Sequence, residues 1–255
     1  MRFRDSVAVV TGAASGIGRE TAFALAREGA AIGCVDVNQS ALADAVREIN
    51  DSGGTAIAAP ADICDSSQVA KAVAAVLAKF GTIGLLVNVA GGALVKPAHK
   101  TTDAEWRDCI ERNLTGTFFF CREVLPIMTG RGHGAIVNMA SSLAHIAAPD
   151  FAAYSAAKAG VVGLTRQLAR DYGPAIRINS VSPAAVDTPS VRAAINASPD
   201  PAAAEAEIAK GNAIARRLAA TREIVAAILF LASDAASFVM GHDLVVCGGQ
   251  TVVAY

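Results

Sequence analysis

The chain has few charged residues and no surplus of either sign. Asp, Glu, Lys and Arg make up 18% of its 255 residues, and the formal net charge at pH 7 is −1. Proteins that bind nucleic acid or anionic membranes by electrostatic attraction carry clustered basic residues, so we expect neither partner. Aromatic residues are also scarce, at 5%, whereas hydrophobic residues reach 53%. That composition suits helices packed on both faces of a buried sheet.

Paired cysteines and long apolar runs are absent as well. The five cysteines are scattered, odd in number and never spaced Cys-x-x-Cys (Cys34, Cys64, Cys109, Cys121 and Cys247). This pattern predicts neither a disulfide framework nor a zinc site, and the four distant histidines suggest no other metal site. Apolar runs end well short of a membrane span, and the N-terminus leads directly into a strand without a signal peptide. We therefore expect a cytoplasmic protein with reduced thiols.

The N-terminal segment reads as a strand, a glycine turn, a helix and a second strand. An apolar run at Val7–Val10 is followed by the glycine-rich stretch Thr11–Gly18, a helical pattern over Arg19–Glu28 and another apolar run at Ala31–Val35. Asp36 follows directly. This order and length are typical of one βαβ unit.

The glycine turn predicts a site for a dinucleotide. Gly12, Gly16 and Gly18 let the backbone approach a bulky anion with no Cβ in the way, and the following helix points its free N–H groups at that anion. Asp36 can accept hydrogen bonds from ribose hydroxyls. The spacing Gly-x-x-x-Gly-x-Gly differs from the commoner fingerprint, and alone it also fits a turn that only packs a strand against a helix.

The rest of the chain repeats the alternation of strands and helices. We predict strands at 55–59, 83–87, 134–139, 176–181 and 243–246, and helices at 40–52, 66–80, 103–128, 154–172 and 221–233, the 66–80 helix being capped by Ser66. The pattern predicts an α/β protein: one domain over 1–255, with a doubly wound, Rossmann-like parallel sheet of about seven strands and helices on both faces. Residues 182–214 show weaker periodicity, and 184–215 is the expected substrate loop. Ligands bind beyond the carboxyl ends of such strands, where Asp36, Asp62, Asn88, Ser141 and Pro183 fall.

A second motif supplies acid–base chemistry. Tyr154 and Lys158 lie one helical turn apart on the same face, and Ser141 ends the strand before them. A free tyrosine has a pKa near 10, and we expect the Lys158 cation to lower the pKa of Tyr154. A phenol so tuned could exchange a proton with an alcohol or ketone, while Ser141 binds the same substrate oxygen.

Part of this motif also matches another class of enzyme. Ser155 and Lys158 fit the Ser-x-x-Lys signature of penicillin-binding hydrolases. That family also needs Ser-Asp-Asn and Lys-Thr-Gly elements, which this chain lacks. The glycine turn would have no purpose there either, so we reject this interpretation.

Together these residues resemble the classical short-chain dehydrogenase/reductase family over nearly the whole chain. The resemblance rests on Thr11-Gly-x-x-x-Gly-x-Gly18, Asp62, Asn88-x-Ala-Gly91, Asn113, Ser141, Tyr154-x-x-x-Lys158 and the segment from Asn179 through Pro183 to Thr188. It implies hydride transfer between a nicotinamide cofactor and a secondary alcohol or its ketone. It also implies a homo-oligomer, a dimer or tetramer, paired through the helices at 103–128 and 154–172.

The resemblance assigns roles to individual residues. Tyr154 would be the general acid/base, Lys158 would lower its pKa and hold the nicotinamide ribose, and Ser141 would orient the substrate oxygen. Asn113 would kink its helix and hold a water that links Lys158 to solvent. The implied cofactor contacts are Gly12, Ser15, Gly16, Ile17, Gly18, Asp36, Asp62, Ile63, Asn88, Ala90, Gly91, Tyr154, Lys158, Pro183, Val186 and Thr188.

The side chains near the second strand favour NAD over NADP. A carboxylate at Asp36 would repel the extra phosphate of NADP. Members of the family that use NADP place a basic residue where this chain has Ser15 or Val37. Arg19, in the first helical turn, is a weaker candidate for that role.

Three positions depart from the family pattern. Val89 replaces a second asparagine, Ala184 replaces a glycine near the expected nicotinamide, and Cys247 replaces an acid before the late Gly-Gly pair. None of them removes a catalytic group. The added methyl of Ala184 is expected to affect cofactor affinity or loop shape, and Cys247 the C-terminal packing.

The expected substrate is a small or mid-sized secondary alcohol, cyclic or open, or its ketone. Its pocket is predicted to be mainly apolar, with contacts from Leu94, Ser141, Leu143, His145, Phe151 and Ala184. His145 fits either a polar contact or the rim of the pocket. A non-catalytic, dinucleotide-binding regulatory or scaffold protein on the same fold remains the alternative from another functional class.

Overall fold

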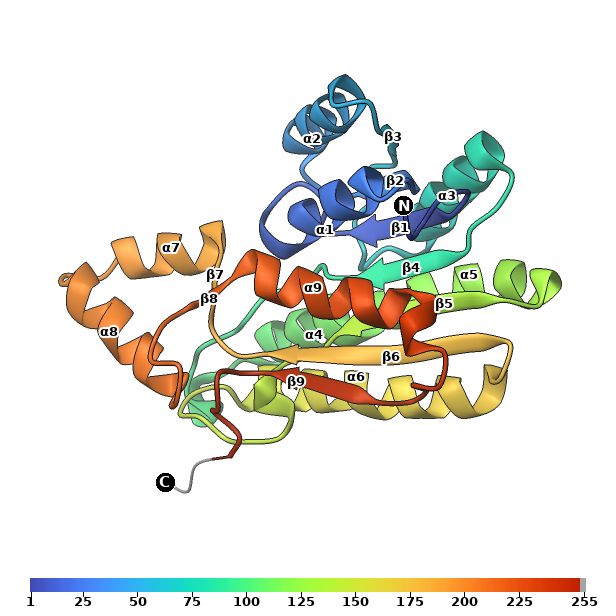
Figure 1. The fold of residues 1–255 in the computed structure, drawn as a ribbon. Coiled ribbons are helices and arrows are strands. Elements are labelled where there is room, and N and C mark those ends of the chain that lie inside the picture. Colours follow the sequence, from blue (N-terminus) through green and yellow to red (C-terminus); the bar gives the residue numbers. More distant parts are fainter. Residues whose placement is uncertain (253–255) are drawn as a thin grey trace.

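The computed structural model describes residues 1–252, which form helices packed on both faces of a parallel sheet (Figure 1). In chain order the elements are β1 (Val7–Thr11), α1 (Gly16–Arg27), β2 (Ala31–Val35), α2 (Gln39–Asp51), β3 (Thr55–Ala58), α3 (Ser66–Phe80), β4 (Leu85–Asn88), α4 (Asp103–Ile110), α5 (Gly116–Arg131), β5 (Gly134–Met139), α6 (Ala152–Tyr172), β6 (Ile176–Pro183), β7 (Val186–Asp187), α7 (Pro189–Asn196), α8 (Pro201–Gly211), β8 (Ala219–Ala220), α9 (Thr221–Ala232) and β9 (Asp243–Val246). Short 3₁₀ turns lie at Ala98–Lys100, Ser142–Ala144 and Asp234–Ala236, and a π-helical turn lies at Glu111–Thr115.

The main sheet has seven parallel strands in the order β3-β2-β1-β4-β5-β6-β9. The strand order reverses direction between β1 and β4, which is the switch point where doubly wound sheets bind their ligands. The predicted fold class is therefore confirmed. A separate two-stranded ribbon pairs β7 with β8.

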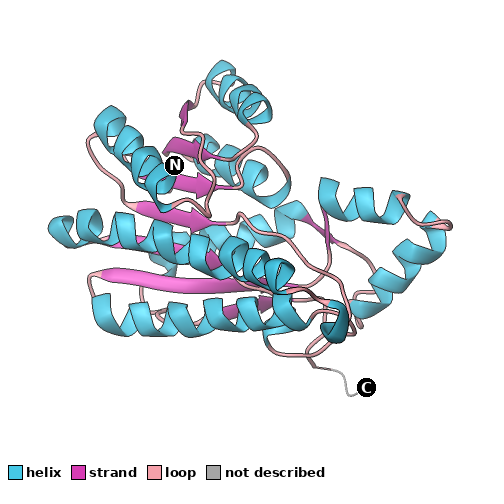
Figure 2. Ribbon diagram, turned by 180° about the vertical axis from the view of Figure 1, so that it is seen from behind, coloured by secondary structure: helices cyan, strands magenta, loops and turns pink. Residues whose placement is uncertain are grey.

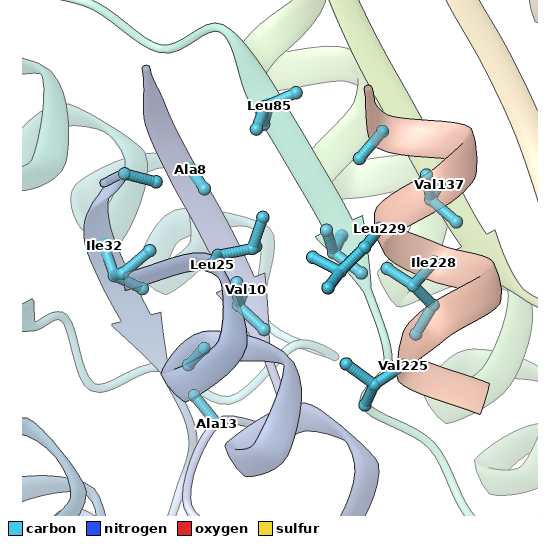
Figure 3. Packing of buried hydrophobic residues seen from close by; sticks show 14 of the residues in the cluster. Ala8, Val10, Ala13, Leu25, Ile32, Leu85, Val137, Val225, Ile228 and Leu229 are labelled. Atoms are coloured by element: carbon cyan, nitrogen blue, oxygen red, sulfur yellow. The ribbon is translucent and has the colours of Figure 1, made fainter. Parts of the chain in front are cut away.

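Alternating side chains on the strands divide the core into two halves. On β1, Ala8 and Val10 belong to the cluster that includes residues of α1 and α9, whereas Val7 and Val9 belong to the cluster that includes residues of α3 and α5. Figure 3 shows the first cluster, in which Leu25 of α1 and Leu229 of α9 both pack on this face of the sheet. Because both faces are covered, as Figure 2 shows from behind, the strands are apolar on both sides.

Several predicted boundaries change in the structure. Asp65 caps α3 in place of Ser66, because its carboxylate accepts hydrogen bonds from the Ser67 and Gln68 N–H groups. The predicted single helix over 103–128 is two helices joined by the π-helical turn. The weakly periodic segment after β6 contains α7 and α8, which project beyond the carboxyl end of the sheet (Figure 1). In the described part of the chain no helix is long and apolar enough to cross a membrane.

Candidate active site

The glycine turn after β1 needs glycine at three positions. Gly12 and Gly16 have positive φ angles of +70° and +53°, a conformation that L side chains rarely adopt. A Cβ on Gly18 would lie 2.2 Å from the Gly12 carbonyl oxygen, so the first turn of α1 can approach β1 only without a side chain there. The three glycines therefore allow the sharp turn and the close backbone approach that the sequence predicts.

The N-terminus of α1 opens into a large cavity. Ser15 occupies the N-cap position, but its side chain accepts no hydrogen bond from the helix, which leaves the first-turn N–H groups available to an anion. The cavity has a volume of about 490 Å³, within the range of cofactor sites. It is lined by Gly12, Ser15, Gly16, Ile17, Gly18, Asp36, Val37, Ala61, Asp62, Ile63, Cys64, Val89, Ala90, Gly91, Asp108, Arg112, Thr188, Pro189 and Ser190.

Asp36 is fixed at the end of β2 by backbone hydrogen bonds. Its carboxylate accepts from the Ala14 N–H at 3.1 Å and from the Asn38 N–H at 2.9 Å. Arg19 is held elsewhere, because its guanidinium donates to Glu48 at 2.6 Å and lies 4.5 Å from the centre of the Phe23 ring. The Asp36 carboxylate therefore lines the cavity. Arg19, the cation that the sequence suggested for this place, pairs with Glu48 instead.

Most of the predicted cofactor contacts line this cavity, and others lie behind its wall. Asn88 is buried at the end of β4, where its side chain donates to Asn138 at 2.9 Å. Pro183 and Val186 are also buried. The Thr11 hydroxyl accepts from the N–H groups of Val89 and Ala90, and these bonds fix the loop after β4 against the glycine turn. Asn88 therefore supports the cavity wall from within the core.

Asn113 lies in the π-helical turn between α4 and α5, which confirms the predicted distortion of its helix. Its side-chain amide donates to the carbonyl oxygens of Gly92 and Cys109, both at 2.9 Å, and its Oδ1 accepts from the Gly92 N–H at 3.1 Å. A Cβ on Gly91 would lie 2.6 Å from Asn113 Oδ1 and 3.6 Å from Lys158 Nζ. Gly91 thus lets Asn113 and Lys158 approach the same loop.

Lys158 is almost completely buried on α6, with 3% of its surface exposed. Its ammonium group donates to the Met139 carbonyl oxygen at 2.8 Å and lies 5.6 Å from the centre of the Tyr154 ring. Burial disfavours the cation and lowers the pKa of Lys158 to about 8. The predicted pairing of this lysine and this tyrosine on one face of a helix is therefore present.

The predicted lowering of the Tyr154 pKa is wrong for this structure. Burial of the phenol raises the pKa of Tyr154 above 10, and a hydrogen bond from Ser141 opposes this effect. The Lys158 ammonium group donates its hydrogen bond to the Met139 carbonyl oxygen. Ser141 and Tyr154 nevertheless lie close enough for their hydroxyl groups to share one substrate oxygen.

The predicted substrate contacts differ in their burial and in their partners. The Phe151 and Tyr154 rings have centroids 6.1 Å apart, and Leu94, Leu143 and Ala184 are half-buried. His145 has a protein partner: its Nε2 lies 2.5 Å from the buried carboxylate of Asp243, which also accepts hydrogen bonds from Ser180 and Ser182. A contact between His145 and a substrate stays a prediction.

Some residues that line the cavity were not predicted from the sequence. Asp108 and Arg112 belong to the cavity wall, as do Pro189 and Ser190 at the start of α7. A signal was present for the first pair. Arg112 directly precedes Asn113, and Asp108 lies one helical turn earlier, so any helix that presents Asn113 to the site also carries this pair nearby.

Comparisons with known proteins agree with this geometry. The sequence model of the family described as "Enoyl-(Acyl carrier protein) reductase" matches residues 12–251. The chain is 44% identical over 253 residues to cis-4-hydroxycyclohexanecarboxylate dehydrogenase of Sinomonas cyclohexanicum, covering 98% of both chains. It is 40% identical over 252 residues to D-threitol dehydrogenase of Mycolicibacterium smegmatis, covering 98% of this chain and 95% of that one.

A solved structure of a relative has the same fold. The 7α-hydroxysteroid dehydrogenase complexed with NADH and 7-oxo glycochenodeoxycholic acid superposes with a TM-score of 0.90 at 32% identity, covering 97% of this chain and 95% of that one. The protein belongs to the short-chain dehydrogenase/reductase family. It is accordingly an oxidoreductase that acts on CH–OH groups with a nicotinamide cofactor.

Proposed function

We propose that the protein oxidises a secondary alcohol, with NAD as hydride acceptor, or reduces the corresponding ketone. The observation that carries this proposal is the Ser141–Tyr154 hydroxyl pair, backed by Lys158 and lying beside a dinucleotide-sized cavity. A scaffold protein would have no physical need for a buried lysine beside a partly buried tyrosine at this place, since burial of the cation alone costs stability.

The residues would divide the chemistry as follows. Ser141 donates a hydrogen bond to the substrate oxygen and holds it beside Tyr154. In the oxidative direction the Tyr154 phenolate accepts the hydroxyl proton, and in the reductive direction the phenol returns it. When bound, NAD supplies the hydride acceptor for the carbinol C–H bond. Asn113 holds the loop at Gly91 and Gly92 in place through its hydrogen bonds with the Gly92 N–H and carbonyl groups, and Lys158 lies against the same loop.

A ring-bearing secondary alcohol is the substrate class that we favour. The cyclohexanecarboxylate relative and the steroid dehydrogenase both act on a hydroxyl or oxo group carried by a ring, as their names state. The half-buried apolar residues Leu94, Leu143 and Phe151 suit the hydrocarbon surface of such a ring. The threitol relative makes an open polyol the alternative.

A spectrophotometric panel tests this function. Purified protein is incubated with NAD or NADP and with cyclopentanol, cyclohexanol, cis-4-hydroxycyclohexanecarboxylate or D-threitol, and the reduced-nicotinamide band is followed. We expect turnover with NAD on at least one cyclic alcohol. Turnover on threitol alone would assign the open polyol class instead. Tight NAD binding with no turnover, including with the matching ketones and NADH, would favour the non-catalytic alternative.

The family description raises reduction of a carbon–carbon double bond as a competing activity. The Ser141–Tyr154 pair favours a carbonyl, because two neighbouring hydroxyl groups can both hydrogen-bond one oxygen. An enoyl thioester with NADH therefore belongs in the same panel, and turnover on that compound alone would overturn the proposal.

We expect NAD to be preferred over NADP because of Asp36. A 2′-phosphate would face this carboxylate with no free cation from Arg19, and such like-charge contacts cost several kcal/mol. Wild-type kcat/KM should be about 100-fold higher with NAD. Asp36→Ala should shrink that ratio by about tenfold or more. Asp44→Ala is the matched control, because Asp44 is an exposed residue of α2 that pairs with Arg47. This variant should leave the ratio of NAD to NADP activity unchanged.

We also propose that the protein is a homo-oligomer in which α4, α5 and α6 meet their symmetry copies. Trp106 on α4 and Phe118 on α5 are large apolar side chains that are 44% and 40% exposed, and such an assembly would cover them. Light scattering coupled to size exclusion should give a dimer or tetramer mass, and a monomer at micromolar concentration would contradict this assembly. The cytoplasmic location stays a prediction.

A further inference from the structure

The Arg112 side chain forms part of the cavity wall, although it belongs to neither the catalytic group nor the glycine turn. It extends from the π-helical turn next to Asn113 and donates a hydrogen bond to Asp108, one turn earlier. Both side chains are about half exposed and line the same cavity. The pairing orients the flat guanidinium and compensates its charge.

Two observations locate this guanidinium along the cavity. Its Nη1 lies 3.6 Å from the point that a Cβ of Gly92 would occupy. The guanidinium also lies near the loop after β3, which contains Cys64. Burial raises the pKa of Cys64 to about 11, and the positive charge of Arg112 partly opposes this rise. Arg112 therefore lies between the loop of Gly92 and the loop of Asp62 and Cys64.

Asp36, Asp62 and Ile63 line the same cavity as Arg112, and on the proposed function they face the adenosine half of the dinucleotide. Because Arg112 lies next to the loop of Asp62 and Cys64, its guanidinium can reach this half. We propose that Arg112 stacks its guanidinium on the adenine base and that Asp108 holds it in that orientation. This inference rests on the proposed function.

The charge balance favours the base over the pyrophosphate. The Arg112–Asp108 pair carries no net charge, so its attraction for a phosphate is small, whereas a planar guanidinium retains its affinity for an aromatic face. The phosphates have their own site in the uncapped N–H groups of α1.

Calorimetric binding of adenosine and of ADP-ribose tests this role without any turnover. Arg112→Ala should weaken both ligands by the same factor, about 3- to 30-fold, and the loss should be the same at low and high salt. Arg107→Ala is the matched control, because Arg107 lies on α4, which leads into the π-helical turn of Arg112, pairs with Asp103 and is exposed. It should leave both affinities unchanged, and thermal melts should confirm that both variants are folded.

The other outcomes separate the two proposals. A loss with ADP-ribose alone that fades with added salt would assign Arg112 to the pyrophosphate and overturn the adenine contact. Unchanged affinity for both ligands would overturn any role of Arg112 in binding. If wild-type protein bound neither ligand, the dinucleotide-dependent function itself would fail.

Discussion

Tyr154→Phe should lower kcat by about 10²- to 10⁴-fold, the range expected for loss of a general acid/base. The substitution removes the hydroxyl that exchanges the proton and keeps the ring that packs near Phe151. We expect NAD to bind with an affinity within about twofold of wild type, because the adenosine and pyrophosphate contacts are unchanged. Steady-state kinetics on a substrate from the alcohol panel and calorimetry with NAD measure the two effects separately.

Tyr172→Phe provides a control for this substitution. Tyr172 lies at the opposite end of α6 and packs against the core cluster that includes α3 and α5. The same change at this position should leave kcat close to wild type. Retention of more than a tenth of wild-type activity in Tyr154→Phe would remove Tyr154 from the chemistry, and equal losses in both variants would point to a packing defect in α6.

The sequence was most informative where local rules decide the outcome. Gly12, Gly16 and Gly18 must be glycine for backbone reasons that depend on near neighbours, so the turn and its cavity could be predicted. The strand ends at Asp36 and Ser141 followed from periodicity alone. The parallel sheet then brings such ends to one edge.

Quantities that depend on packing in three dimensions could not be predicted in this way. The sequence suggested a cation that lowers the pKa of Tyr154, but the structure turns the Lys158 ammonium to a backbone carbonyl and buries the phenol. The partnership of His145 with Asp243 joins residues 98 positions apart, and no periodicity in either segment indicates it. The sequence places Arg112 directly before Asn113, but a 3.6-residue pattern does not reveal the π-helical turn that contains both residues.

The buried lysine gives the second large effect, and its sign can be derived. Burial lowers the pKa of Lys158 from 10.5 to about 8. Between these pH values the unfolded chain binds more protons here than the folded chain does. The free energy of unfolding therefore rises with pH across this window. Below about pH 8 the folded protein carries the full cost of the buried cation.

Lys158→Met should therefore abolish turnover and yet stabilise the fold near neutral pH. Removal of the buried charge should outweigh the lost hydrogen bond to Met139, which is worth about 1 kcal/mol, and give a net gain of roughly 1–2 kcal/mol at pH 7. The gain should shrink as the pH approaches 10, because wild-type Lys158 then becomes neutral. Urea unfolding at several pH values measures this gain in stability. Lys71→Met is the control, because Lys71 is exposed on α3. Its difference in stability from wild type should stay constant with pH. A Lys158→Met variant less stable than wild type at pH 7, with no pH dependence in the difference, would show that the charge of Lys158 is compensated in the folded protein and that its burial carries no such cost.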